Sequence, residues 1–187
     1  MSSFYFCPHT AIVAFVILRP GIAVFVLLSV AFAQTDDPKN GLIKTGANAV
    51  RDAMLGDNYS VVIDLTYPPI VDMLGGREKA VGVVQEQMKA IKEQGVSISS
   101  FTLSEPSEIK TGGSELFSIL PATMEMKAPQ AKITLKTFLI AISRDQGKSW
   151  SYADGSNLTP ELMKTLFPKF PPDLKLPEKS NVVEKIP

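Results

Sequence analysis

The side chains that most often carry metal binding and nucleophilic catalysis are scarce in this sequence. Its 187 residues include one histidine, His9, and one cysteine, Cys7. Zinc and other soft-metal sites need several such ligands, and Ser-His-Asp or Cys-His catalysis needs a histidine beside the nucleophile. One cysteine also cannot form a disulfide within the chain. The sequence therefore predicts no metal, no cofactor and no catalysis of these types.

Aromatic and carboxylate side chains are the remaining candidates for a binding site, and they fall in two stretches. The first has two tyrosines with an aspartate between them, and the second has Trp, Tyr and Asp at alternating positions. Rings that alternate along a strand either pack on the sheet or line the mouth of a cavity. For the remaining candidates the simpler roles are a core edge for the first two tyrosines, a helix surface for the aspartate between them and a turn for the last aspartate. The candidate ligand-binding residues are Tyr59, Asp64, Tyr67, Trp150, Tyr152 and Asp154.

The charge balance argues against nucleic acid as a partner. The chain has 19 Lys and Arg against 19 Asp and Glu, a formal net charge of zero, and its basic residues do not form a long cluster. A protein that holds a phosphate backbone needs a basic patch, because neutralised phosphates supply most of the affinity. We therefore predict no nucleic-acid partner.

The N-terminal segment is typical of an export signal. The first 35 residues contain no acid and a single base, Arg19, which is followed by an apolar run. Ala31 and Ala33 then form a small-x-small cleavage motif directly before Gln34. This order predicts a signal peptide over residues 1–33, and with it a protein exported to the periplasm or the extracellular space.

An uncleaved membrane anchor is the alternative for the same segment. Residues 10–33 are long enough to cross a bilayer. Such a span would place Arg19 and Pro20 near its middle, where a charge costs at least about 2.5 kcal/mol. We therefore favour the signal peptide, and expect membrane association only if that segment is not removed.

The exported part has the length of one domain followed by a tail. Residues 34–167 are enough to bury a core without disulfides. From Pro168 the composition changes, because five prolines fall within the last 20 residues and the end is charged and polar. We therefore predict one domain over 34–167, whose α+β class and cone shape are argued below, and a Pro-rich extended tail over 168–187.

Helical spacing dominates the first half of this domain. Asp37 and Pro38 suit the cap and first position of a helix that ends at Gly56. Asp57 or Asn58 can cap a second, shorter helix, which Pro68 and Pro69 must stop. One more helical turn is predicted before the glycines that follow.

The most regular helical pattern lies between Arg77 and Gly95. Its apolar residues recur at spacings of three and four, and its charged residues lie mostly off that stripe. We expect this stripe to form the main contact between the helices and a sheet, so that Val84→Asp would prevent folding. The stripe consists of Val81, Val84, Met88 and Ile91.

After Gly95 the apolar period changes to two, and β-branched and aromatic residues become common. Pro121 suggests a bulge or bend within the longest strand. Met124 and Met126 suit either an adaptable core or a soft binding surface. A short closing helix is predicted from Thr159. The predicted strands cover residues 96–103, 108–111, 115–127, 132–143 and 148–153.

The strand around Leu135 to Ile142 is apolar on both faces, so both faces of the central sheet must be covered. We expect the helices to cover one face. The other would be hidden by a partner subunit or by the C-terminal segment Leu162–Phe170, because an open apolar face invites association. If the tail covers it, truncation after Asn157 should cause aggregation.

Helices followed by antiparallel strands define an α+β protein, with N-terminal helices packed on a curved antiparallel sheet and a short C-terminal helix. This order resembles the nuclear transport factor two-like, cystatin-like cone superfamily, and within it a group of exported bacterial proteins without an assigned activity. The resemblance includes the stretches Tyr67-Pro68-Pro69, Gly75-Gly76-Arg77-Glu78 and Lys148–Gly155. It implies a half-open cone with an apolar cavity, often paired into homodimers through the sheet face.

Three functions remain open at the level of sequence. The first is a non-catalytic module that binds a small apolar ligand or a partner chain in or beside the cone. The second is a structural or envelope-associated protein. The third, implied by the resemblance, is an isomerase or cyclase, which would use an Asp base with Tyr and a second carboxyl group as donors. The residues available for it are Tyr59, Asp64, Tyr67 and Asp154.

Overall fold

The structure is a computed structural model that describes residues 37–186. The predicted signal peptide, with its cleavage residues Ala31, Ala33 and Gln34, lies outside the described residues. From residue 37 to residue 186, none of the helices combines the length and the apolar character needed to cross a membrane. Export and processing therefore stay predictions.

The predicted helices are present with nearly the expected bounds. The carboxylate of Asp37 accepts a hydrogen bond from the Lys39 backbone N–H at 3.0 Å, and Pro38 takes the first helical position. The Asn58 side chain caps the next helix in the same way. The helices are α1 (Pro38–Leu55), α2 (Tyr59–Asp64), α3 (Pro68–Met73), α4 (Arg77–Glu93) and α5 (Pro160–Leu166).

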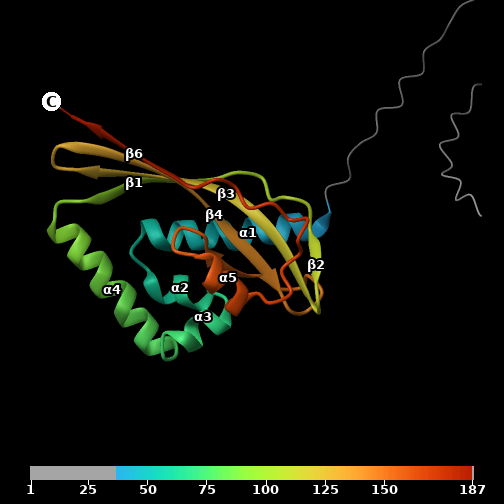
Figure 1. Ribbon diagram of the computed structural model, residues 1–187. Coiled ribbons are helices and arrows are strands. Elements are labelled where there is room, and N and C mark those ends of the chain that lie inside the picture. Colours follow the sequence, from blue (N-terminus) through green and yellow to red (C-terminus); the bar gives the residue numbers. More distant parts are fainter. Residues whose placement is uncertain (1–36, 187) are drawn as a thin grey trace, which may run out of the picture. The chain divides into compact units, whose positions relative to one another are not determined.

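The strands form one six-stranded, antiparallel, curved and open sheet (Figure 1). Its centre is the long hairpin of β3 and β4. Along its other edge, β3 pairs with β1 over one half of its length and with β2 over the other half. In the same way, the outer edge of β4 pairs with β5 near one end and with β6 near the other. The strands are β1 (Ser97–Leu103), β2 (Lys110–Gly112), β3 (Glu115–Ala128), β4 (Ala131–Ser143), β5 (Ser151–Asp154) and β6 (Ser180–Lys185).

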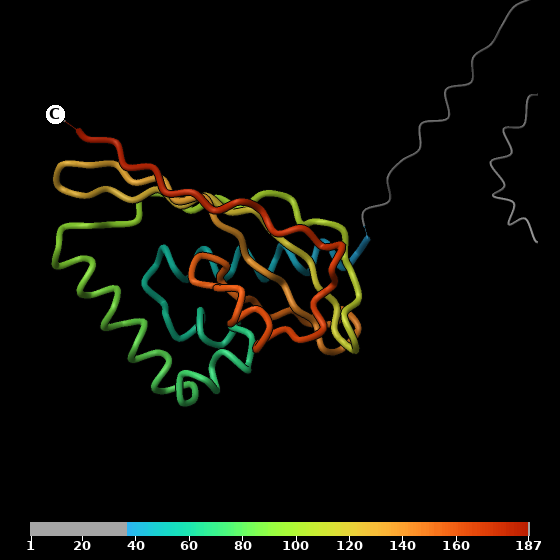
Figure 2. Tube along the Cα trace, in the orientation of Figure 1, coloured from blue at the N-terminus to red at the C-terminus, as the bar shows by residue number. Residues whose placement is uncertain are grey.

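Strand β6 is the element that the sequence did not predict. The tail leaves α5 and runs back along the sheet to the far end of the central hairpin (Figure 2), where it pairs with β4. All six residues of β6 are exposed, so it lacks the apolar alternation that marks a half-buried strand. The extended tail thus contributes a strand.

One face of the sheet packs against α1, and we call it the α1 face. The apolar residues of α1 point at alternate residues of the central strands, including Leu120 and Leu139. Helix α1 comes so close that a Cβ atom at Gly46 would collide with the Tyr152 hydroxyl. The core on this face contains Ile43, Ala47, Val50, Leu116, Leu120, Leu139, Ala141, Trp150 and Tyr152.

The opposite face packs against α5 and the start of the tail, and we call it the α5 face. Phe167 is 2% exposed and its ring contacts those of Tyr67 and Phe117, with centroids 5.3 and 6.0 Å apart. Leu174 of the tail belongs to the same core as Ile140. Of the two covers considered for this face, a partner subunit or the C-terminal segment, the structure shows the C-terminal segment packed on it. A homodimer through this face stays a prediction. The part of the face under α5 and the start of the tail is already covered, so it does not need a partner subunit.

The expected role of α4 was wrong. The stripe Val81, Val84, Met88 and Ile91 is only half-buried, and Ala80 is the one buried residue of the helix. Helix α4 runs from beside α3 to the start of β1 (Figure 1) and packs mainly on α2, whereas α1 makes the main helix contact with the sheet. Periodicity identified the apolar side of α4 and could not identify the element that it faces.

Pro121 also differs from its expectation, because it causes no bulge. The β3–β4 register is continuous from Leu116 to Ala128, and the irregularity lies in β1, between Ile98 and Ser100. Pro121 lies where β1 ends and before β2 begins, so the missing N–H disrupts neither pairing. Its carbonyl still accepts a hydrogen bond from Ser104.

Candidate functional site

The aromatic pair of the last strand belongs to the core under α1. The Tyr152 hydroxyl donates to the Ile43 carbonyl at 2.7 Å, and burial raises the pKa of this phenol. Trp150 is 8% exposed, and its Nε1 has no hydrogen-bond partner among the described residues. Both rings therefore hold α1 on the sheet, which is the simpler of the two roles considered for them.

Tyr67 lies on the other face of the sheet. Its ring packs in the α5-face core, and its hydroxyl donates to Glu115 Oε1 at 2.9 Å. Burial, followed by the hydrogen bond to Glu115, raises the pKa of Tyr67 to about 12. A phenol with such a pKa stays protonated at neutral pH and is a structural donor here.

The two aspartate candidates are at the surface and make local contacts. Asp64 binds the Arg77 guanidinium through both oxygens, at 2.6 and 2.8 Å, and this hydrogen bonding lowers the pKa of Asp64. Asp154 accepts from the Ser156 backbone N–H at 2.9 Å, as a turn residue does. The structure thus places the candidates on both faces and at the surface, and does not bring them to one point.

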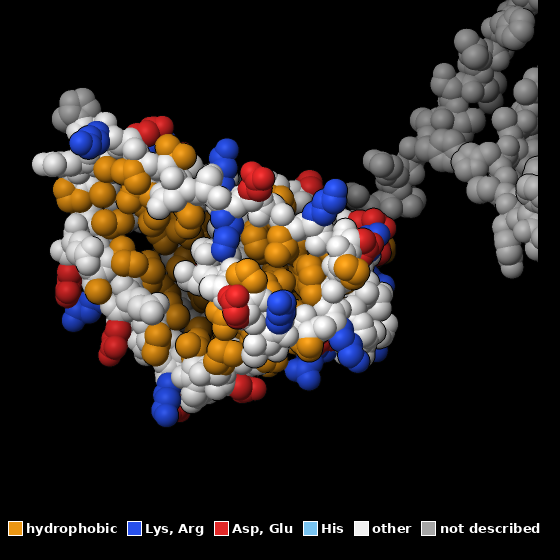
Figure 3. All heavy atoms as spheres, in the orientation of Figure 1, with side chains coloured by type: hydrophobic (Ala, Val, Ile, Leu, Met, Phe, Trp, Pro, Cys, Tyr) orange, Lys and Arg blue, Asp and Glu red, His pale blue; other side chains and the backbone are white. Residues whose placement is uncertain are grey.

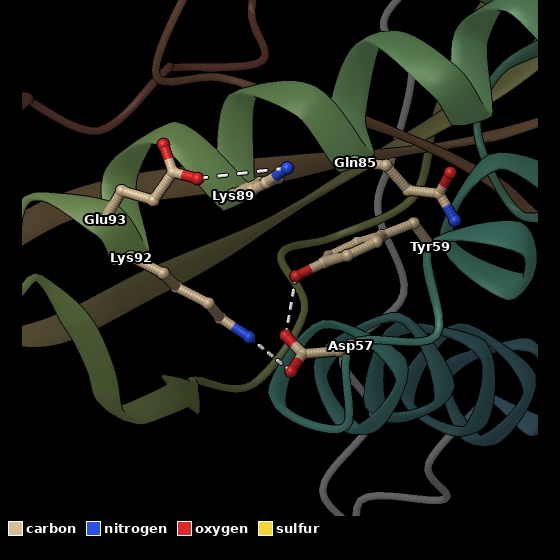
Figure 4. Close-up of a pocket in the computed structure, with 6 residues that line it drawn as sticks. All are labelled: Asp57, Tyr59, Gln85, Lys89, Lys92 and Glu93. Carbon is tan, nitrogen blue, oxygen red and sulfur yellow. Dashed lines mark hydrogen bonds and ion pairs between the residues drawn. The ribbon is translucent and has the colours of Figure 1, made fainter.

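Tyr59 is the candidate that lines a pocket. A pocket of about 410 Å³ lies between α2 and α4. The Tyr59 hydroxyl donates to Asp57 Oδ1 at 2.5 Å, and the Lys92 ammonium binds the other oxygen of the same carboxylate (Figure 4). The lining residues are Asp57, Tyr59, Gln85, Lys89, Lys92 and Glu93.

The charged groups of this pocket pair with one another. The hydrogen bond from Lys92, with that from Tyr59, lowers the pKa of Asp57, and burial raises the pKa of Tyr59 to about 12. Lys89 faces Glu93 at 3.8 Å. Neither Asp57 nor Tyr59 is therefore poised to exchange a proton near neutral pH.

A second, apolar hollow lies between α4 and the far half of the α1 face. Beyond the end of α1, apolar residues of three strands continue on this face but are only half-buried. Figure 3 shows hydrophobic side chains gathered around a hollow between α4 and these strands. The half-buried apolar strand residues here are Ile98, Met124, Met126, Ile133 and Leu135, and the residues of the α4 stripe are half-buried as well.

Ion pairs with α2 hold α4 at its position. Arg77 at the start of α4 binds Asp64, and Lys92 near its end binds Asp57, so the two ends of α4 are tied to the two ends of α2. Gly95 follows α4 with a φ of 75° and lets the chain turn sharply into β1. These contacts keep α4 beside α2, and the residues of its stripe remain half-buried.

Within residues 37–186, no group of three or more His, Cys, Asp or Glu side chains could hold a metal ion. No family profile matches the chain, and no curated protein or solved structure is significantly similar to it. The site therefore has to be argued from its own residues.

The sequence carries one signal for the hollow. Met124 and Met126 suit either an adaptable core or a soft binding surface, whereas the spacing of the α4 stripe by itself predicts a core contact. Both sets are half-buried, and Figure 3 shows hydrophobic side chains around a hollow between α4 and this part of the sheet.

Proposed function

We propose that this protein is a non-catalytic binding module that holds a small, flexible apolar ligand in the hollow between α4 and the sheet. The observation that carries the proposal is the half-burial of apolar residues on both sides of the hollow. An apolar stripe that packs on a sheet becomes buried, whereas here Val84 and Met88 remain partly accessible and so do Met124 and Leu135. A ligand that filled this space would remove all of them from water.

The chemistry of the lining fits an aliphatic ligand. Its members are branched aliphatic residues and three methionines, Met88, Met124 and Met126. Methionine side chains are flexible and polarisable, so they adapt to ligands of varied shape. Each buried CH₂ group of a ligand would contribute about 0.8 kcal/mol, so a chain of several carbons binds without a charged anchor.

The proposed cone-type relationship supports the same site. That relationship implies an apolar cavity between helices and a curved sheet, and the hollow has these surroundings. The proposal also includes export, because a binding module with this N-terminal pattern would act outside the cytoplasm.

Binding of a fluorescent apolar probe, N-phenyl-1-naphthylamine, tests the proposal. Val182 and Val183 form a matched pair on β6, since Val183 pairs with Ile133 of the hollow and Val182 pairs with Thr134 on the opposite face. We expect Met126→Gln and Val183→Asn to weaken probe binding, and Val182→Asn to leave it unchanged. Octanoic acid or 1-octanol should displace the probe.

Two results would contradict the proposal. Equal effects of the Val182 and Val183 variants would show that the probe binds to exposed apolar surface in general. Absence of saturable binding would favour the structural, envelope-associated alternative.

A further inference from the structure

Three serine or threonine side chains are buried in the described part of the chain, and they differ in their hydrogen bonds. The Ser118 hydroxyl donates to the Ser107 carbonyl at 2.8 Å, and the Ser143 hydroxyl donates to Asp145 Oδ1 at 2.8 Å. Thr137 is 5% exposed, and its Oγ1 has no hydrogen-bond partner among residues 37–186. Thr137 is therefore the exception that needs an explanation.

The place of Thr137 in the sheet links it to the hollow. Every second residue of β4 points to the α1 face. Of these residues, Ile133 and Leu135 are half-buried, whereas Thr137 and Leu139 are buried. Thr137 pairs with Ala122, so Met124 of the hollow is its diagonal neighbour on the same face. Thr137 thus lies where the filled core of the α1 face meets the half-buried residues beside the hollow.

Stability alone does not account for threonine at this position. Threonine and valine have the same branched shape, and valine would fill the site without a polar group. An unpaired buried hydroxyl destabilises the folded state, because its hydrogen bonds to water are lost and not replaced. A hydroxyl kept beside an apolar hollow is explained if a ligand supplies its partner.

We propose that Thr137 determines specificity by hydrogen bonding to a neutral polar end group of the apolar ligand, with the alkyl chain lying along Met124, Leu135 and the α4 stripe. The end group is a hydroxyl or a carbonyl. A charged end group is disfavoured, since the residues beside Thr137 on this face are apolar and would desolvate the charge. To reach Oγ1, the ligand must displace a covering side chain, and the flexible Met124 is suited to that movement.

This inference rests on the proposed function and is tested with two probes of equal length, 1-octanol and n-octane. The variants are Thr137→Val, which keeps the shape, and Thr137→Ser, which keeps the hydroxyl. Thr134→Val is the matched control, because Thr134 is half-buried on the same strand but on the opposite face. Affinities come from displacement of the fluorescent probe, and thermal stability from circular dichroism.

We expect Thr137→Val to weaken 1-octanol binding about tenfold, as the loss of one buried hydrogen bond and the stranding of its partner imply. The same variant should bind n-octane as well as the wild type does, and its melting temperature without ligand should rise. Thr137→Ser should retain the preference for the alcohol, and Thr134→Val should change neither affinity.

Other outcomes separate the two proposals. Unchanged 1-octanol affinity in Thr137→Val would overturn the role of Thr137, including the case in which a trapped water already satisfies the hydroxyl, while the hollow would stay a binding site. Equal losses for both probes would also overturn it, because the effect would then be one of shape. Failure of both probes to bind the wild type would overturn the proposed function and this inference with it.

Discussion

The position of α4 leads to opposite expectations for two residues one helical turn apart. Ala80 is fully buried and Val84 is half-buried, although residues four apart lie on the same side of a helix. We compare Ala80→Asp with Val84→Asp. The introduced carboxylate and the helical position are alike, so the difference between the variants reports the local environment of each side chain.

The magnitudes follow from burial. An uncompensated buried charge destabilises a protein by about 3–5 kcal/mol, and Ala80→Asp must also displace its neighbours. Full burial of a valine contributes about 1.5–3 kcal/mol, so the half-buried Val84 accounts for about 1 kcal/mol, and a carboxylate there still reaches water. Typical domains have free energies of unfolding of about 5–15 kcal/mol. Ala80→Asp should therefore remove a large share of the stability, and Val84→Asp a small one.

Urea denaturation followed by circular dichroism measures both effects as shifts of the midpoint at constant slope. In a domain of this size, 1 kcal/mol corresponds to a shift of roughly 2–4 °C in the melting temperature, so thermal scans give a second reading. Val84→Asp should fold and should lose binding of the apolar probe. If the two variants are destabilised equally, Val84 is packed as the sequence first indicated, and the hollow does not exist.

Two further predictions concern the cores. Phe167→Ala should destabilise the protein by about 3–5 kcal/mol, because Phe167 joins the tail to the α5-face core, whereas the exposed Lys164→Ala should be nearly silent; equal melting temperatures would contradict the packing of the tail. Burial raises the pKa values of Tyr59 and Tyr67 to about 12 from 10.0, so the folded state holds these protons more tightly than the unfolded state. That contribution to stability is complete below pH 10 and is lost as the pH rises from about 10 to about 12. In a Tyr5→Phe variant, whose remaining tyrosines are Tyr59, Tyr67 and Tyr152, ultraviolet titration at increasing pH should show phenolate only as the protein unfolds, and reversible ionisation near pH 10 in the folded state would refute the prediction.

The local elements could be predicted from the sequence because their signals are local. The cap formed by Asp37 and Pro38 and the stripe between Arg77 and Gly95 located two helices within about two residues of their observed bounds. The alternation of β3, with Leu116 and Leu120 on one face and Phe117 and Ile119 on the other, agrees with the two cores. These patterns depend on the helical and strand periods, which each segment carries by itself.

The candidate site could not be predicted in the same way. The sequence suggested Tyr59, Tyr67 and Tyr152 as possible contacts of one ligand. In the structure the sheet separates two of them, because Tyr67 lies in the α5-face core and Tyr152 in the α1-face core. The Thr137 hydroxyl gives no signal in the sequence either, since its missing partner is a property of all the residues around it.

The sequence by itself determined the type and order of most elements, the two apolar faces of the central strands and the need to cover both. The tertiary structure decided what covers them, which is α1 on one face and α5 with the tail on the other. It also decided that α4 is tied to the α2 region and that its stripe stays half-buried. Strand β6 likewise exists only through its pairing with β4. Periodicity shows which side of an element avoids water, but the amount of water actually excluded depends on residues distant in the chain.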